Sequence, residues 1–313
     1  MSLKNILFVF CLCWILPESA CDSSRPPTPS DKPGIGTIQI SVDESFQPVI
    51  EEVIKTYQTL YPKAHILASY KTESECLKDF FYDSSCRIAI VGRGLSEKEA
   101  QKMTDSLMYR PGWRKLATDA IALVVPYDSE DTLFTIQDLK DMLSGKRRDY
   151  QLVFDGLRAT STYRFLQDSL LQGKIPDTAL VRAAKNSSAL LDFVAESKEK
   201  ILGLVGVSWI GNPEEPAQTE LLKKVKIAYL RCDACAGTPF VKPMQASMMT
   251  GRYPLRRSMY YLIKENYKGL GTGFISFLKY EQGQLIFRRS YLRPEMELGV
   301  RNVHIHLRNN QEE

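Results

Sequence analysis

Histidine is scarce in this chain, and apolar runs of membrane-spanning length are missing. The three histidines, His65, His304 and His306, have no further metal ligands close by in the sequence, so we expect them to fill core or surface positions. GxSxG, HExxH and P-loop motifs are absent, as is a carboxylate pair in a credible context. These absences argue against an enzyme and against a resident metal or cofactor.

The chain also lacks a large excess of either positive or negative charge. The 313 residues include 41 basic and 37 acidic side chains, and a net charge of +4 is too small and too evenly spread to indicate nucleic-acid binding. The densest basic runs, at 146–148, 256–257 and 288–289, are short, and we expect them on the solvated surface. With 44% hydrophobic and 25% charged residues, the chain has the composition of a soluble globular protein and the length of two ordinary domains.

The N-terminus differs from the rest of the chain. Lys4 precedes an almost wholly apolar run from Ile6 to Leu16, which is too short for a finished transmembrane helix and is typical of an export signal. Ser19–Ala20–Cys21 is similar to the end of a bacterial lipobox, so we expect residues 1–21 to be a signal and Cys21 to carry lipid. Residues 22–36, rich in Ser, Pro and Thr, would be the tether. We expect an exported protein, held by lipid on the periplasmic side of a bacterial membrane.

Four cysteines remain outside the signal and the lipid site. Two local disulfides, Cys76–Cys86 and Cys232–Cys235, are conceivable in an oxidising compartment. Only the second pair has the spacing of zinc ligands, and no histidine lies near either pair.

Strand and helix patterns alternate along the first half of the chain. Residues 37–42, 65–70 and 87–92 have the pattern of strands, and an amphipathic helix is predicted from Val49 to Tyr61. Ser96 and Glu99 have the spacing of a capping box. Near the C-terminus, residues 284–292 are predicted as a closing strand. This plan indicates an α/β fold with a largely parallel sheet, in which ligands bind beyond the carboxyl ends of the strands.

The segment Val153–Gly173 predicts a strand, a turn and a helix with a polar loop between them. Arg158, Thr160, Ser161 and Thr162 lie where the helix begins, and free N–H groups there attract an anion. The alternative is that Thr160 or Ser161 is a helix cap and Arg158 a surface charge. A second polar pair, Thr118–Asp119, interrupts the apolar run 115–126 and requires a structural or ligand partner.

The order of these motifs resembles that of the periplasmic phosphate-binding proteins of ABC transporters. The likeness covers residues 37–292 and rests on the order of the segments SVDESF, YKTESE, VGRGLS, ATDAIALVV, DGLRATST, GLVGVSWIG and YPLRRSMYYL. It implies the two-lobe, class II periplasmic-binding-protein fold, in which each lobe is a mostly parallel sheet flanked by helices. Residues 37–121 plus 240–313 would form lobe 1, and residues 122–239 would form lobe 2.

The resemblance also implies a set of phosphate-binding residues. Ser45 and Phe46 match the first turn of the family and Ser74 its second loop, while Thr160, Ser161 and Thr162 match the central loop, with Arg158 as the nearest candidate for the family arginine. Arg93, Thr118 and Asp119 complete the expected site. Many members have an aspartate at the place of Arg93 to accept a proton from hydrogen phosphate. Here Asp43, Glu44, Asp119 or Asp155 would have to accept it.

The function that the resemblance implies is capture of phosphate between two lobes for an inner-membrane ABC permease. Two alternatives stay open on the sequence alone. The same fold could bind another oxyanion or a small organic acid, or it could serve adhesion or signalling as a lipoprotein without the ligand.

Overall fold

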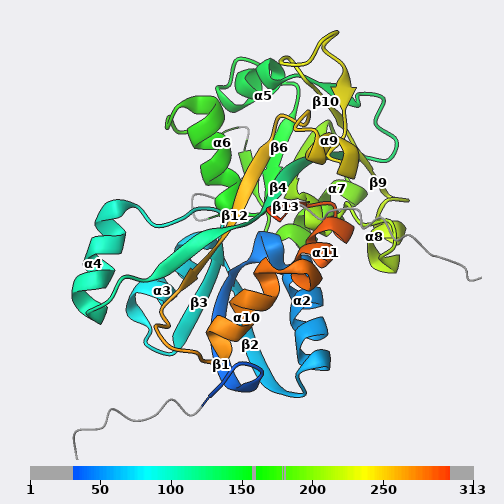
Figure 1. Ribbon diagram of the computed structural model, residues 1–313. Coiled ribbons are helices and arrows are strands. Elements are labelled where there is room, and N and C mark those ends of the chain that lie inside the picture. The colour runs from blue at the N-terminus through cyan, green and yellow to red at the C-terminus, as the bar shows by residue number, and fades with distance from the viewer. Residues whose placement is uncertain (1–30, 157–159, 178, 180, 297–313) are drawn as a thin grey trace, which may run out of the picture. The chain divides into compact units, whose positions relative to one another are not determined.

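A computed structural model describes residues 31–156, 160–177, 179 and 181–296 of the chain. All described elements belong to the unit that begins at Asp31 (Figure 1). Four residues singled out in the sequence lie outside the described residues: Cys21, Arg158, His304 and His306. No helix within the described ranges is long and apolar enough to span a bilayer.

The fold is mixed α/β, as the sequence pattern predicts. The strands are β1 (Ile35–Asp43), β2 (Lys63–Lys71), β3 (Cys86–Val91), β4 (Gly112–Pro126), β5 (Leu133–Phe134), β6 (Gln151–Phe154), β7 (Val181–Ala183), β8 (Ile201–Gly206), β9 (Val225–Ile227), β10 (Tyr229–Arg231), β11 (Phe240–Val241), β12 (Arg256–Ile263) and β13 (Arg293–Pro294). The α-helices are α2 (Gln47–Leu60), α3 (Glu73–Tyr82), α4 (Glu97–Leu107), α5 (Ile136–Leu143), α6 (Ser161–Leu171), α7 (Ser187–Glu196), α8 (Pro216–Leu221), α9 (Gln245–Met249), α10 (Leu270–Lys279) and α11 (Glu281–Arg289), with two 3-10 turns, η1 (Glu44–Phe46) and η2 (Val207–Trp209).

Ten strands form one sheet in the order β2-β1-β3-β12-β4-β8-β6-β7, with β9 and β13 also paired to β4. The long strand β4 connects its two parts. Residues 112–120 of β4 pair with β12, whereas residues 121–126 pair with β8 and β9. The β1–β2 and β1–β3 pairs are parallel, and so are β6–β7 and β6–β8, while β4 and β12 run antiparallel to their neighbours.

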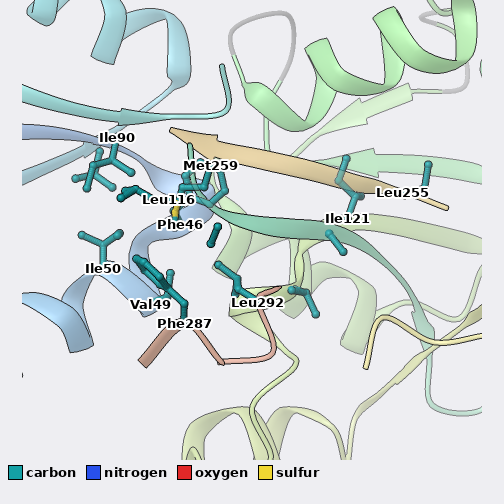
Figure 2. Packing of buried hydrophobic residues seen from close by; sticks show 14 of the residues in the cluster. Phe46, Val49, Ile50, Ile90, Leu116, Ile121, Leu255, Met259, Phe287 and Leu292 are labelled. Carbon is teal, nitrogen blue, oxygen red and sulfur yellow. The ribbon is translucent and has the colours of Figure 1, made fainter. Parts of the chain in front are cut away.

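Successive side chains of a strand point to opposite faces of the sheet, so they pack against different layers of helices. In β3, Ile88 and Ile90 pack in one core with residues of α2 and α10. Ala89 and Val91, on the other face, pack with residues of α3 and α4. Figure 2 shows part of the first core, where Phe46 of η1 lies close to Leu116 and Met259.

The second part of the sheet repeats this arrangement. Leu123 and Val125 of β4 belong to a core that includes residues of α5 and α6. Ala122 and Val124 face the opposite way and pack with Leu190, Leu191 and Val194 of α7. Burial of both faces explains why the run from Ile121 to Val125 is continuously apolar.

A separate three-stranded sheet contains β11, β10 and β5. β11, which the expected boundary at residue 240 assigns to lobe 1, pairs here with β10 of the predicted lobe 2. Cys232 and Cys235 form a disulfide in the turn that follows β10. Cys76 and Cys86 are buried free thiols.

Two segments of the chain fold differently from the sequence expectation. Residues 284–292, predicted as a strand, mostly belong to helix α11, because Gly283, Gln284 and Phe287 share one buried helical face. Asp31, expected in the tether, is instead buried. Both of its carboxylate oxygens accept hydrogen bonds from Arg87, at 3.1 and 2.8 Å, so the chain is anchored from this residue onward.

Candidate functional site

Seven polar side chains from distant parts of the chain meet where the two parts of the sheet join. We call them the Arg257 cluster, and its members are Asp43, Ser45, Asp119, Asp155, Ser161, Thr162 and Arg257. Each is at most 4% exposed. They come from β1, η1, β4, the loop after β6, the start of α6, and β12.

Arg257 holds the cluster together. It lies opposite Asp119 in the β12–β4 pair, and its Nε donates to Asp119 Oδ2 at 2.8 Å. Its Nη1 donates to the hydroxyls of Ser161 and Thr162, at 2.9 and 3.0 Å. The guanidinium carbon lies 4.9 Å from the centre of the Phe46 ring, a distance typical of a cation–π contact.

The hydroxyl groups relay these bonds to two further carboxylates. Ser45 Oγ donates to Asp43 Oδ1 at 3.0 Å and lies 3.2 Å from Ser161 Oγ. Thr162 Oγ1 donates to Asp155 Oδ2 at 2.8 Å. Since Ser45 uses its proton on Asp43, Ser161 is the donor in the Ser45–Ser161 bond.

Four polar atoms of the cluster have no hydrogen-bond partner among the described residues. They are Asp43 Oδ2, Asp119 Oδ1, Asp155 Oδ1 and Arg257 Nη2. Of the buried side-chain atoms without a partner in the described ranges, the only other one belongs to Gln151. An unsatisfied buried polar atom costs about 1–3 kcal/mol, so this concentration in one place points to a binding site.

Local sequence explains how each element presents its residue. Asp43 ends β1, and its carboxylate accepts from the backbone N–H of Ser45, which turns the chain into η1. Thr160 caps α6 by accepting from the N–H of Tyr163, so Ser161 and Thr162 occupy the first turn. Gly206 has no side chain, which leaves room for the Ser45 carbonyl group and the Arg257 guanidinium. A Cβ there would lie 2.8 Å from the Ser45 carbonyl oxygen and 2.9 Å from Arg257 Nη2.

Burial raises the pKa of the carboxyl groups in the cluster. For Asp43 the pKa rises to about 6, chiefly through burial and then through the nearby charge of Glu73, although Arg257 opposes the rise. Burial also raises the pKa of Asp119 and of Asp155. Next to the cluster, burial raises the pKa of Glu44 to about 7.

Two carboxylates flanking the cluster link the first part of the chain to α6 and α7. Glu73 accepts from Arg164 Nε at 2.5 Å and Nη2 at 3.0 Å, and also from the N–H of Gly92. Glu44 accepts from the backbone N–H and hydroxyl of Ser187, at 3.0 and 2.8 Å. These two contacts join residues 91 and 143 positions apart in the sequence.

Of the residues expected in the site, the structure brings together Ser45, Asp119, Ser161 and Thr162, with Phe46 beneath the guanidinium. Thr160 is the helix cap that the alternative interpretation described. Thr118 neighbours Asp119 on β4, so its side chain points to the opposite face.

The remaining two expected residues are not brought to the cluster. Arg93 forms a bidentate ion pair with Glu99, at 2.8 and 2.7 Å, next to the capping box of α4. Ser74 is exposed on α3, and the buried residue beside it is Glu73.

The buried position of Arg257 shows that the prediction of a surface location for the basic pair 256–257 is wrong for this residue. Its side chain is only 2% exposed. A signal was available, because Arg257 stands in an alternating strand pattern where Leu255, Met259 and Tyr261 are buried on the same face. On β4, the charged Asp119 within an apolar run indicated in the same way that a buried partner of opposite charge was required.

A cavity of about 840 Å³ lies elsewhere, between α2, α7, α8 and α11. It is lined by six carboxylate residues and three basic ones. The carboxylates are Glu51, Glu52, Asp192, Glu214, Glu215 and Glu220, and the basic residues are Lys55, Lys224 and Arg289. An excess of negative charge makes this cavity a poor site for an anion.

Comparisons with known proteins agree with this architecture. The chain is similar to a putative phosphate ABC transporter substrate-binding protein with bound phosphate from Clostridium perfringens, with 19% identity, a TM-score of 0.67, and coverage of 83% of this chain and 100% of that one. It is also similar to an ABC-type phosphate transport receptor from Vibrio cholerae, with 18% identity, a TM-score of 0.58, and coverage of 83% and 100%. A comparison with curated proteins found no match.

A family model supplies the assignment. The model of the PBP superfamily domain matches residues 27–280, which is most of the chain. The resemblance drawn from the order of motifs is confirmed by this match and by the shared fold. The chain therefore belongs to the PBP superfamily and has the fold of the phosphate-binding proteins of ABC transporters.

Proposed function

We propose that this protein is an extracytoplasmic solute-binding protein that captures phosphate at the Arg257 cluster and delivers it to an ABC permease. The observation that carries the proposal is the group of four unpartnered polar atoms on Asp43, Asp119, Asp155 and Arg257. Binding, rather than catalysis, is the role of such a site, since charge-assisted hydrogen bonds are enough to hold an oxyanion.

The cluster offers both a donor and acceptors, which are the two kinds of partner that a protonated phosphate requires. Arg257 Nη2 supplies unused N–H donors for the phosphate oxygens, and the free oxygens of Asp43, Asp119 and Asp155 need O–H donors. Hydrogen phosphate has both kinds of group. Fully deprotonated sulfate has only acceptors, so it leaves the carboxylate oxygens unsatisfied.

We propose that the two parts of the sheet are lobes that separate to admit the anion. Lobe 1 would contain residues 37–121 with the C-terminal quarter, and lobe 2 the middle of the chain. Because β11 pairs with β10, we move the second boundary from residue 240 to the start of β12. The Ser45–Ser161, Glu73–Arg164 and Glu44–Ser187 contacts would break on opening and re-form on closure.

The N-terminal sequence is the basis for the proposed membrane attachment. We propose that Cys21 is lipidated and that the protein works on the periplasmic side of a bacterial membrane. The full chain expressed in a bacterial host should partition with membranes, and Cys21→Ser should release it or leave the signal uncleaved. Equal partitioning of the two forms would refute the anchor.

A thermal-melt panel tests the proposed function. The protein from Asp22 onward should gain stability in millimolar phosphate or arsenate, and less in sulfate or molybdate, because ligand that binds only the folded form stabilises it by mass action. Arg257→Lys should reduce the gain. Arg252→Gln, which alters an exposed arginine five residues away, should not.

The panel also separates the two alternatives. A gain with sulfate or with a small organic acid, and none with phosphate, would favour a different ligand for the same fold. No gain with any of them would favour an adhesion or signalling lipoprotein. One observation supports that alternative. Arg257 Nη1 already donates to Ser161 and Thr162, so this part of the guanidinium needs no ligand to satisfy it.

A further inference from the structure

The Arg257 cluster contains more negative than positive groups. One guanidinium faces the carboxyl groups of Asp43, Asp119 and Asp155, and all four side chains are nearly inaccessible to solvent. If all of them are ionised, the cluster carries a charge of −2 before any ligand enters. Adding a phosphate dianion to this buried charge without compensation is strongly unfavourable.

Among the described residues, which do not include 157–159, the groups packed around the cluster do not cancel this excess. Glu73 of α3 acts on Asp43, and Glu44 of η1 interacts with both Asp43 and Asp155. The nearby cation, Arg164 of α6, is already paired with Glu73. The positive end of α6 contributes only a partial charge.

The hydroxyl protons of the cluster are also committed. Arg257 donates to Ser161, which donates to Ser45, which donates to Asp43. Arg257 also donates to Thr162, which donates to Asp155. Each chain of bonds ends on a carboxylate, so these hydroxyls can turn toward an anion only if another proton satisfies the carboxylate.

We infer that phosphate binds to the Arg257 cluster together with at least one proton taken from solution, an inference that rests on the proposed function. From the dianion the balance is protein + HPO₄²⁻ + H⁺ → complex. The proton lies between a phosphate oxygen and the carboxyl oxygen of Asp43, Asp119 or Asp155. It removes one negative charge from the site and provides one of the missing donors. The raised pKa of these carboxyl groups is in keeping with this uptake.

Calorimetry counts the protons directly. Phosphate is titrated into the protein at about pH 8, where free phosphate is largely the dianion, in two buffers with different heats of ionisation. The difference between the observed heats gives the number of protons taken up. We expect at least one, and affinity should fall about tenfold for each pH unit above this point. Binding with no proton uptake would overturn the inference and leave phosphate capture intact.

Two variants locate the proton. Asp155→Asn and Asp43→Asn each retain an acceptor for the neighbouring hydroxyl and add permanent N–H donors. If the proton lies at Asp43 or Asp155, the variant at that position should bind phosphate with less proton uptake and a flatter pH dependence, whereas Asp192→Asn, an exposed control on α7, should behave as wild type. Unchanged uptake in both cluster variants would assign the proton to Asp119, the third carboxyl group. If wild type shows no phosphate binding between about pH 5 and pH 8, the proposed function itself fails.

Discussion

Arg257 and Asp119 stand directly opposite each other on β12 and β4, with Nε and Oδ2 2.8 Å apart and both side chains almost fully buried. An ion pair at this depth gains little net stability, because desolvation of the two charges offsets much of their attraction. The pair holds the guanidinium in place, and its Nη2 has no hydrogen-bond partner among the described residues, so it is free for the proposed ligand.

Removal of Arg257 should therefore affect both folding and binding. Arg257→Ala leaves three buried carboxyl groups without their cation, and we expect a loss of about 3–5 kcal/mol in the free energy of unfolding at neutral pH. Arg257→Lys retains the charge but not the planar fork, so it should recover part of the stability and little of the phosphate affinity. Urea unfolding and calorimetric titration measure the two effects. A stability of Arg257→Ala equal to wild type would contradict the buried placement.

Thr160 and Ser161 are neighbours with different expected roles. Thr160→Ala removes the cap of α6 and should cost about 1 kcal/mol of stability, with phosphate affinity unchanged. Ser161→Ala removes the contact between Arg257 and Ser45, and we expect about a tenfold loss of affinity, equivalent to about 1.4 kcal/mol. Melting each variant without ligand and titrating it with phosphate compares the two. The reverse pattern would make Ser161 the capping residue and exclude it from the site.

Stability should increase as the solution becomes mildly acidic. Burial raises the pKa of Glu44 to about 7 and that of Asp43 to about 6, so the folded protein holds protons that the unfolded chain releases. The cost of burying these charges is fully present above about pH 7 and decreases as pH falls toward the ordinary pKa values of 4.5 for Glu44 and 3.8 for Asp43. We expect the free energy of unfolding to rise by on the order of 2 kcal/mol from pH 8 to pH 5.

Glu44→Gln is the variant that tests this pH dependence. It keeps an acceptor for Ser187 and removes the titration, so the rise should become smaller. Glu52→Gln, at an exposed position on α2, is the control. A wild-type stability that falls steadily from pH 8 to pH 5 would contradict the raised pKa values.

The cysteines make a prediction that needs no ligand. In protein that begins at Asp22, unfolded without reductant, a thiol reagent should titrate two groups, Cys76 and Cys86. The Cys232–Cys235 bond closes a very short loop, so Cys232→Ser with Cys235→Ser should cost about 2 kcal/mol or less. Four reactive thiols would refute the disulfide, and none would place a second one between Cys76 and Cys86.

The sequence by itself determined the class of fold and several local features. The continuous apolar run Ile88–Val91 is typical of a strand that helices cover on both faces, and the structure contains such a strand. The capping box at Ser96 and Glu99 is confirmed as well. Such features depend on residues a few positions apart, so the local pattern is sufficient to predict them.

Only the tertiary structure decided where Arg257 lies and what surrounds it. Its carboxylate partner is 138 positions away and its hydroxyl partners 96 and 95 positions away. The alternating pattern around Arg257 indicates an inward-facing position, but it does not show whether an opposite charge meets the arginine there, and its burial depends on that partner. Residues 284–289 form a helix for a similar reason. Gln284 donates to the carbonyl oxygens of Leu116 and Leu278, so tertiary packing outweighed the β-like local sequence.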